Sequence, residues 1–418
     1  MPTRALSSRN LSGCALVEDS AELESRQWLE PAVAQMPEPA AVPAAARAKQ
    51  HHIEVAVSRP VFYENVSHLR ELVAPSQLCV VLKSSAYGHG LAALAPVAVA
   101  AGADYLGICT NPEAAAVRSL GLDVPLLRLR MGLREELDES AKELDIEEQV
   151  GTLAAAEYLS DLGRRVGRDL RVHLNIDTGM GRSGFFPEQV DAIRRVIGMP
   201  GLRVVGVMTH FPSADGAEIG PTGQILDAFE DLCRQIADSL PDDVMIHTHN
   251  SAATVRIAER RRTMVRVGAA CYGVRTSQEF SNPAALRPVM SIKTRVAQVR
   301  DIPAGRTIGY GGLYTTQRPS RIASLPVGFG EGYPRSLFNK GIVLIHGERC
   351  PVVGRVSLNI TTVDVTNLAE PAEWGDEVVL VGTQGDDEIS FEFLADKFAS
   401  VHTEINLMAG SMNEIRHL

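Results

Sequence analysis

The sequence predicts an α/β fold in which a (β/α)8 barrel is followed by a mainly β domain. From about residue 53 to about residue 273, eight short apolar runs alternate with helix-like stretches. After about residue 288 the pattern changes to short β-like runs that are separated by turn residues. Apolar strands that alternate with helices are typical of a parallel sheet, and eight units in about 220 residues fit a closed barrel of the TIM type.

The eight strand candidates of the barrel share an apolar run that is followed by a helical or helix-like segment. They are Leu78–Leu82, Tyr105–Cys109, Pro125–Leu129, Ile146–Val150, Val172–Ile176, Val204–Met208, Val244–His247 and Met264–Val267. Stretches such as Pro187–Val196 and Ile225–Ser239 supply the helices. An open doubly wound sheet is the alternative, and it predicts a GxGxxG turn after the first strand. No such turn follows Leu78–Leu82, which favours the barrel.

The predicted second domain is built from short β-like runs. They are Ser291–Val299, Ile322–Val327, Gly341–Ile345, Pro351–Val353, Thr361–Val365 and Glu377–Val381. Only Ser390–Ala399 looks helical in this part of the chain. We therefore predict a flexible extension over residues 1–51, where Ala-Pro-rich text occurs, a barrel over residues 52–288 and a β domain over residues 289–418. The alternation in residues 53–58 predicts a strand that can pair with the β domain.

Composition limits the classes of function. The chain has 418 residues, of which 45% are hydrophobic and 22% charged, and this is enough for two globular domains. Its net charge of -10 argues against a nucleic-acid partner, and the lack of a run of about 18 apolar residues argues against a membrane span. The six cysteines form no CxxC pair, so we predict neither a metal site nor a disulfide framework. Because no signal-peptide pattern is visible, we expect a cytoplasmic location, with periplasmic export as the alternative.

Polar residues gather at the carboxyl ends of the predicted strands, where the reactive groups of a parallel barrel lie. They are Lys83, Cys109 and Thr110, Arg128 and Arg130, Asn175 and Asp177, His210, His247 with Asn250 and Ser251, and Arg266 with Gly268. A shared ligand pocket would satisfy these polar groups together. Lys83 is the most informative, because it is one of only six lysines and alone ends a strongly apolar strand. A lysine there suits a Schiff base with a carbonyl compound, whereas the alternative is a lysine that snorkels to the barrel rim.

The residues around Lys83 closely resemble the cofactor-lysine motif of the alanine racemases, which are fold-type III pyridoxal-phosphate enzymes. Leu82–Gly90 reads LKSSAYGHG, where that family usually has Ala-Asp in place of Ser84-Ser85. Further motifs follow in the family's order: Asp177–Gly184 (DTGMGRSG), Thr209–Phe211, Asn250–Ala253, Val265–Gly268, Ile302–Gly311, Pro326–Arg335 and Val353–Asn359. The resemblance covers about residues 53–367, and so many motifs in order across two domains make it specific.

This resemblance implies a racemase that interconverts the L- and D-enantiomers of free amino acids with two bases and pyridoxal 5'-phosphate. Lys83 would carry the cofactor and serve one face of Cα. Tyr310, which in the family comes from the other subunit of a homodimer, would serve the other face, helped by a Tyr310–His210–Arg266 chain of hydrogen bonds. The implied cofactor contacts are Lys83, Tyr87, His210, His247, Asn250, Ser251, Arg266, Gly268 and Ala269. The implied substrate contacts are Arg182, Asn175, Arg130, Tyr333 and Leu358.

Several positions depart from the alanine racemase pattern. Asn175 stands where many members have a carbamylated lysine, so we expect Asn175, or an anion that it binds, to orient Arg182. Asn175, Pro212 and the run Leu126–Arg130 (LLRLR) resemble the broad-spectrum racemases, which predicts a neutral or basic substrate range wider than alanine. Leu358 replaces a methionine at the substrate entrance, and no tyrosine remains near the C-terminus to hold the phosphate.

Two other classes of function remain as alternatives. One is a different fold-type III activity, such as a D-amino-acid dehydratase or a decarboxylase, and the other is a non-catalytic pyridoxal-phosphate carrier. Tyr310 argues for racemisation, because chemistries that use one base do not need it. The predicted second domain argues against the carrier, which is normally a single barrel.

Overall fold

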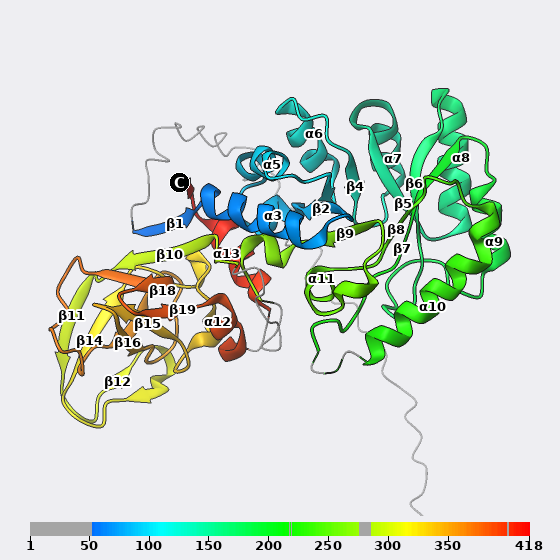
Figure 1. Cartoon of the computed structure of the whole chain (residues 1–418). Coiled ribbons are helices and arrows are strands. Elements are labelled where there is room, and N and C mark those ends of the chain that lie inside the picture. Colours follow the sequence, from blue (N-terminus) through cyan, green and yellow to red (C-terminus); the bar gives the residue numbers. More distant parts are fainter. Residues whose placement is uncertain (1–51, 217, 219, 276–285, 399–400) are drawn as a thin grey trace, which may run out of the picture. The chain divides into compact units, whose positions relative to one another are not determined.

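We describe the chain from a computed structural model that covers residues 52–216, 218, 220–275, 286–398 and 401–418. The extension predicted over residues 1–51 lies outside the described residues. The described part from residue 52 onward belongs to one compact unit. Figure 1 shows its elements in chain order. No helix in these described ranges is long and apolar enough to cross a membrane.

Eight parallel strands close into a barrel, which confirms the predicted fold class. They are β2 (Gln77–Val81), β3 (Tyr105–Ile108), β4 (Leu126–Arg128), β5 (Ile146–Val150), β6 (Leu170–Asn175), β7 (Leu202–Met208), β8 (Met245–His247) and β9 (Met264–Val267). Each strand pairs in parallel with the next, and β9 pairs with β2 to complete the circle. The carboxyl ends of all eight strands therefore meet on one face of the barrel.

Helices precede and connect the strands. They are α3 (Arg59–Val73), α4 (Lys83–Tyr87), α5 (Leu91–Ala100), α6 (Asn111–Ser119), α7 (Arg134–Glu139), the π-helix η2 (Ser140–Leu144), α8 (Leu153–Val166), α9 (Val190–Ile197), α10 (Gly220–Ile236), η3 (Ala237–Ser239), α11 (Ser251–Arg256), η4 (Ala258–Arg260) and η5 (Ala269–Tyr272). Helix α10 shows why these segments pack onto the barrel. Its buried residues Leu226, Phe229, Leu232 and Ile236 recur every three or four positions and form one apolar face.

The C-terminal domain is mainly β, as predicted. Its strands are β10 (Met290–Arg295), β11 (Gln298–Ile302), β12 (Thr307–Ile308), β13 (Tyr314–Thr315), β14 (Ser320–Leu325), β15 (Ile342–Ile345), β16 (Glu348–Pro351), β17 (Thr361–Asp364), β18 (Glu377–Gln384), β19 (Asp387–Ile389) and β20 (Ile415–His417). Short 3-10 turns η6 (Tyr310–Gly312), η7 (Phe329–Glu331) and η8 (Arg335–Leu337) interrupt them. The single run predicted over Ser291–Val299 is two strands, and the strand predicted at Pro351–Val353 lies slightly earlier as β16.

The prediction of one helix after residue 390 was wrong. Two helices follow, α12 (Phe391–Phe398) and α13 (His402–Met412). The sequence hides α13 because its buried positions include Asn406 beside Ile405 and Ala409, so no continuous apolar stripe marks the helix.

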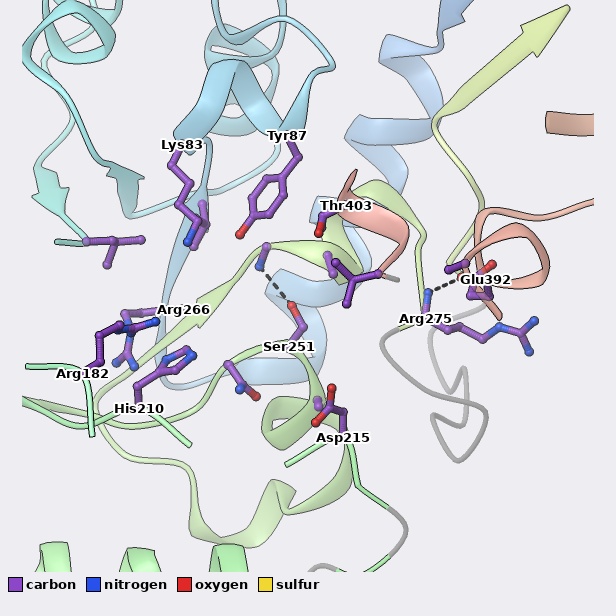
Figure 2. A pocket seen from close by; sticks show the side chains of 18 of the residues that line it. Lys83, Tyr87, Arg182, His210, Asp215, Ser251, Arg266, Arg275, Glu392 and Thr403 are labelled. Atoms are coloured by element: carbon purple, nitrogen blue, oxygen red, sulfur yellow. Dashed lines mark hydrogen bonds between the residues drawn. The ribbon is translucent and has the colours of Figure 1, made fainter. Parts of the chain in front are cut away.

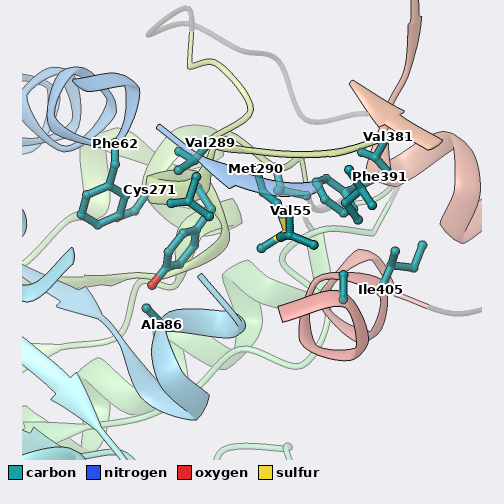
Figure 3. Packing of buried hydrophobic residues seen from close by; sticks show 14 of the residues in the cluster. Val55, Phe62, Ala86, Cys271, Val289, Met290, Val381, Phe391 and Ile405 are labelled. Atoms are coloured by element: carbon teal, nitrogen blue, oxygen red, sulfur yellow. The ribbon is translucent and has the colours of Figure 1, made fainter. Parts of the chain in front are cut away.

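The first strand of the described chain belongs to the β domain. β1 (Ile53–Val57) pairs antiparallel with β10 and parallel with β20. A single hydrophobic cluster then joins the barrel to this sheet, and Figure 3 shows Phe62 and Cys271 of the barrel part in the same cluster as Met290, Phe391 and Ile405. This packing seats α13 directly on the Lys83 segment. A Cβ added at Gly88 would lie 2.4 Å from the Asn406 carbonyl oxygen, so only glycine permits this approach.

Candidate active site

A cavity of about 760 Å³ opens at the carboxyl ends of the barrel strands. Most of the predicted site residues line it, as Figure 2 shows. They are Lys83, Tyr87, Asn175, Arg182, His210, Asn250, Ser251, Arg266, Gly268 and Ala269. These residues come from five different strand ends, and parallel topology brings them to one place.

Lys83 stands immediately after β2, at the start of an unusual turn. Ser84, Ser85, Ala86 and Tyr87 all have φ between 52° and 57°, a left-handed conformation that costs L-residues about 1–2 kcal/mol each. Glu113 holds the turn, because its Oε1 accepts hydrogen bonds from the N–H groups of Ser84 (2.5 Å) and Ser85 (3.4 Å). Such strain is typical of functional sites. Lys83 Nζ lies 5.8 Å from the centroid of the Tyr87 ring and forms no hydrogen bond or ion pair within the described ranges.

A set of hydrogen-bond donors lies on the other side of the cavity. Ser251 Oγ accepts from the N–H groups of Gly268 (3.0 Å) and Ala270 (3.3 Å), which leaves its own O–H free to donate into the cavity. Ala269 begins η5, so its N–H is not used within that helix. Tyr87 packs against Gly268, where an added Cβ would lie 2.8 Å from Tyr87 Oη. Burial raises the pKa of Tyr87 far above its usual value, so its phenol is a donor at neutral pH.

The Arg182 loop is held by its own backbone. The Asp177 carboxylate accepts hydrogen bonds from the N–H groups of Gly179 (3.0 Å), Gly181 (3.0 Å) and Arg182 (3.1 Å). These bonds lower the pKa of Asp177, although burial opposes them as the largest single influence. Asn175 Nδ2 donates to the carbonyl and hydroxyl oxygens of Ser183, at 2.8 and 3.1 Å, and forms no hydrogen bond with Arg182 among the described residues. The direct contact with Arg182 is therefore not formed, and the alternative, an anion held between the two residues, stays a prediction.

Within the described residues no hydrogen bond joins His210 to Arg266, and the Tyr310 end of the predicted Tyr310–His210–Arg266 chain, which was expected from another subunit, stays a prediction. The Arg266 guanidinium donates from Nη1 to His247 Nδ1 (2.8 Å) and from Nη2 to the Thr209 carbonyl oxygen (2.6 Å). Burial lowers the pKa of Arg266 to about 10, so it stays a cation near neutral pH. Burial, with the positive charges of Arg266, Arg182 and Lys83, lowers the pKa of His210 to about 3, so His210 is neutral.

Five predicted site residues lie away from the cavity wall. Arg130 forms an ion pair with Glu136, and Tyr333 is buried within the β domain. His247 is fully buried and its two ring nitrogens bond Arg266 and His173, so it supports Arg266 from below. Tyr310 and Leu358 are 73% and 55% exposed on the β domain.

Arg128, which the strand-end pattern also suggested for the pocket, is a structural residue. It is completely buried, and its guanidinium binds both oxygens of Glu148, at 2.7 and 3.0 Å. Its Nη2 also donates to Asn111 Oδ1 at 2.6 Å. These bonds satisfy the charge inside the barrel wall, so no ligand is needed to satisfy it.

Several cavity residues were missed by sequence reasoning. Gln149 and Met208 lie at the ends of β5 and β7, so the strand-end rule would have found them if it had been applied to every strand. Asp215 comes from the loop after β7. Thr403 of α13 points into the cavity near Tyr87 in Figure 2, and no sequence signal marked it, because only tertiary packing brings α13 to the barrel.

A closed (β/α)8 barrel with a polar cavity at its strand ends, followed by a β domain, defines an enzyme whose active site is built from the barrel loops. Residues 57–276 match the family described as alanine racemase, N-terminal domain, and residues 289–416 match alanine racemase, C-terminal domain. The chain therefore belongs to the alanine racemase family, which confirms the resemblance seen in its motifs.

Curated relatives cover nearly the whole described chain. An alanine racemase of Syntrophobacter fumaroxidans is 37% identical over 86% of this chain and 96% of its own length. A broad specificity amino-acid racemase of Pseudomonas taetrolens is 36% identical over 86% of this chain and 88% of its own. A solved structure of alanine racemase from Streptomyces lavendulae aligns with a TM-score of 0.82 and 31% identity over 88% of this chain and 98% of that one. These likenesses assign the chain to the isomerases.

Proposed function

We propose that this protein is a pyridoxal-phosphate-dependent amino-acid racemase in which Lys83 and the Tyr310 of a second copy are the two bases. The observation that carries the proposal is the cavity itself. An unpaired lysine faces a cluster of phenol, hydroxyl and backbone donors across a space that also holds Arg182 and Arg266.

The residues present fit pyridoxal phosphate. Ser251, Tyr87 and the N–H of Ala269 form a donor set suited to a phosphate, close to the bare backbone of Gly268. Thr403 lies near this set and adds a hydroxyl where the family's C-terminal tyrosine is missing. Arg266 keeps its charge and would donate to the pyridine nitrogen without giving up its proton. Bound pyridoxal phosphate supplies the electron-withdrawing ring that makes the Cα proton of an amino acid acidic.

Lys83 would hold the cofactor and, once released, move the Cα proton on one face of the substrate. Its freedom from hydrogen bonds and ion pairs within the described ranges supports this role, because its amine need not leave a partner. Arg182 is exposed at the cavity and its guanidinium bonds no described residue, so it is available to bind the substrate carboxylate. Neutral His210 can accept or donate a proton-relay hydrogen bond without adding a charge to the three cations Arg266, Arg182 and Lys83.

Tyr310 would serve the opposite face from a neighbouring subunit. It lies outside the cavity of its own chain and is 73% exposed. Leu313, Leu358 and Ile360 are also exposed, and the Tyr310 and Leu358 segments adjoin, because an added Cβ at Gly309 would lie 3.2 Å from the Arg355 nitrogen. An exposed apolar surface that carries the missing base supports a homodimer with shared active sites.

A substrate range wider than alanine is supported by two observations. Asn175 bonds Ser183 and not the Arg182 guanidinium, which has no hydrogen bond within the described residues, and no lysine stands at position 175. Relatives of nearly equal similarity carry the names broad specificity amino-acid racemase and lysine racemase, the latter from Proteus mirabilis at 32% identity. We propose that neutral and basic amino acids both react. The cytoplasmic location expected from the sequence stays a prediction.

The test is to incubate the cofactor-loaded protein with single enantiomers of alanine, serine, lysine and arginine in deuterated water. Loss of chirality together with deuterium at Cα is expected, and the amino acids that react define the range. Lys83→Ala should abolish both, whereas Lys142→Ala, which changes an exposed lysine of η2, should not. Reaction of alanine alone would remove the broad range. A protein that holds cofactor but leaves every enantiomer unchanged would disprove the racemase.

A further inference from the structure

We propose that Glu147 is a positioning residue that holds Arg266 of the active site through a continuous hydrogen-bond chain across the barrel interior, Arg266–His247–His173–Glu147. The inference rests on the proposed function, because it assigns Arg266 to the cofactor. Glu147 does not line the cavity, so the inference assigns a role in the active site to a carboxylate that lies outside it.

Three hydrogen bonds form the chain. Arg266 Nη1 and His247 Nδ1 are 2.8 Å apart, His247 Nε2 and His173 Nδ1 are 2.9 Å apart, and His173 Nε2 and Glu147 Oε2 are 2.8 Å apart. Each bond lies within the normal length for its atoms. All four side chains are at most 4% exposed, so water does not compete for these groups.

The chemistry of its two ends fixes the direction of every bond. A guanidinium only donates, so Nδ1 of His247 must be an acceptor and its proton must be on Nε2. That N–H donates to Nδ1 of His173, whose proton is therefore on Nε2 and points at Glu147. The carboxylate only accepts, and so both neutral tautomers are set by Arg266 at one end and Glu147 at the other.

The backbone leaves room for this path. The chain runs from β5 through β6 to β8 and β9, and it passes over β7 at Gly206. A Cβ added at Gly206 would lie 2.1 Å from His173 Nδ1, so any other residue would displace the imidazole from His247. The glycine at position 206 therefore gives the His173 imidazole the space that it needs to reach His247, and this is a second observation in favour of the chain.

Arg266 needs this support because no carboxylate contacts it within the described ranges. Apart from His247, its guanidinium meets only the carbonyl oxygens of Thr209, His247 and Thr248. A buried cation is expensive unless it is paired and hydrogen-bonded. Glu147 is the final acceptor of the chain, and its second oxygen is ion-paired with Arg171 at 2.8 Å, which holds the carboxylate in place.

Glu148 provides a matched control. It is the next residue, is buried to the same extent and bonds the side chains of Arg128 and Ser140, neither of which contacts Arg266, His247 or His173 among the described residues. We would compare the cofactor-loaded wild type with Glu147→Gln, Gly206→Ala and Glu148→Gln. The readouts are the imidazole N–H signals of 15N-histidine-labelled protein, the absorption maximum of the bound cofactor, and kcat for racemisation.

We expect Glu147→Gln and Gly206→Ala to shift the His173 and His247 N–H signals and the cofactor absorption. We also expect kcat to fall by about 10–100-fold, the range known for residues that orient metal-bound histidines through a hydrogen bond. Glu148→Gln should leave the histidine signals and the absorption as in the wild type. If Glu147→Gln does not fold, Gly206→Ala still breaks the chain without removing a charge. Unchanged signals and absorption in both variants, or equal shifts in Glu148→Gln, would overturn the proposal. The histidine signals do not depend on turnover. If the protein racemised no amino acid but the variants still showed these shifts, the racemase proposal would be disproved and the hydrogen-bond chain would still stand.

Discussion

The barrel mouth and the exposed edge of the β domain differ in how completely one chain builds them. At the barrel mouth, Lys83, Ser251, Arg266 and Gly268 converge on one cavity, and buried hydrogen bonds fix the last three. At the β-domain edge, Tyr310 is on a short 3-10 turn and 73% exposed. The difference is what the proposed function requires, in which one chain binds the cofactor and presents Tyr310 as the second base to another copy.

The largest expected effect tests this division by complementation. Tyr310→Phe should lower racemisation by about 10²–10⁴-fold, the usual contribution of one proton-transfer group, and Lys83→Ala should abolish it. When the two inactive variants are refolded together, roughly a quarter of the wild-type activity should return, because half the dimers are mixed and each has one intact site. Mixed dimers shown by mass spectrometry without any recovery would place both bases in one chain.

The second prediction concerns a substitution on the exposed edge of the β domain, where we propose the dimer interface. Ile360 is 51% exposed near Leu358, and a buried glutamate is unfavourable at the core of an interface. Ile360→Glu should therefore halve the mass measured by light scattering and reduce racemisation at least tenfold, while the cofactor remains attached to Lys83. Trp374→Glu is the control, because Trp374 is 85% exposed in the same domain. A dimer that survives Ile360→Glu would contradict this interface.

The third prediction tests the barrel half alone. Gly268→Ala places a Cβ 2.8 Å from Tyr87 Oη, and overpacking of this kind costs about 1–3 kcal/mol. We expect a cofactor dissociation constant about tenfold higher, measured by fluorescence titration, with the dimer unchanged. Gly223→Ala, where an added Cβ meets nothing within 4 Å, should bind the cofactor as the wild type does. Equal affinity in both variants would show that the Gly268 cradle is not the phosphate site.

The smallest expected effect concerns the stability of the barrel half. Burial lowers the pKa of His89 to about 4, and burial likewise lowers the pKa of His249 to about 4. A histidine that the fold keeps neutral gives stability that is fully present above about pH 6.5 and is lost as pH falls towards 4. We expect the free energy of unfolding in urea to fall by about 2 kcal/mol for each of these two histidines between pH 7 and pH 5. His89→Gln should remove part of this slope, and a flat profile would show that these histidines are not buried as described.

Much of the site follows from local pattern. Apolar runs of four or five residues that alternate with helices predict parallel strands, and parallel strands bring their carboxyl ends together whatever the details of packing. For this reason Lys83, Arg266 and Ser251 were placed at one cavity from the sequence, and the family motifs predicted the enzyme class that the comparisons confirm.

Other features depend on which distant segments touch, and no local period encodes that. Thr403 reaches the cavity only because α13 packs on Gly88, and Tyr310 leaves it only because its turn lies on the outer edge of the β domain. The strand-end rule likewise predicted that Arg128 and His247 line the pocket. In the structure Arg128 pairs with Glu148 inside the barrel, and His247 accepts a hydrogen bond from Arg266. Sequence thus determined the strands and the chemistry at their ends. Tertiary structure decided which polar groups face the ligand and which satisfy one another, because a buried charge bonds whatever partner the packing brings within about 3 Å.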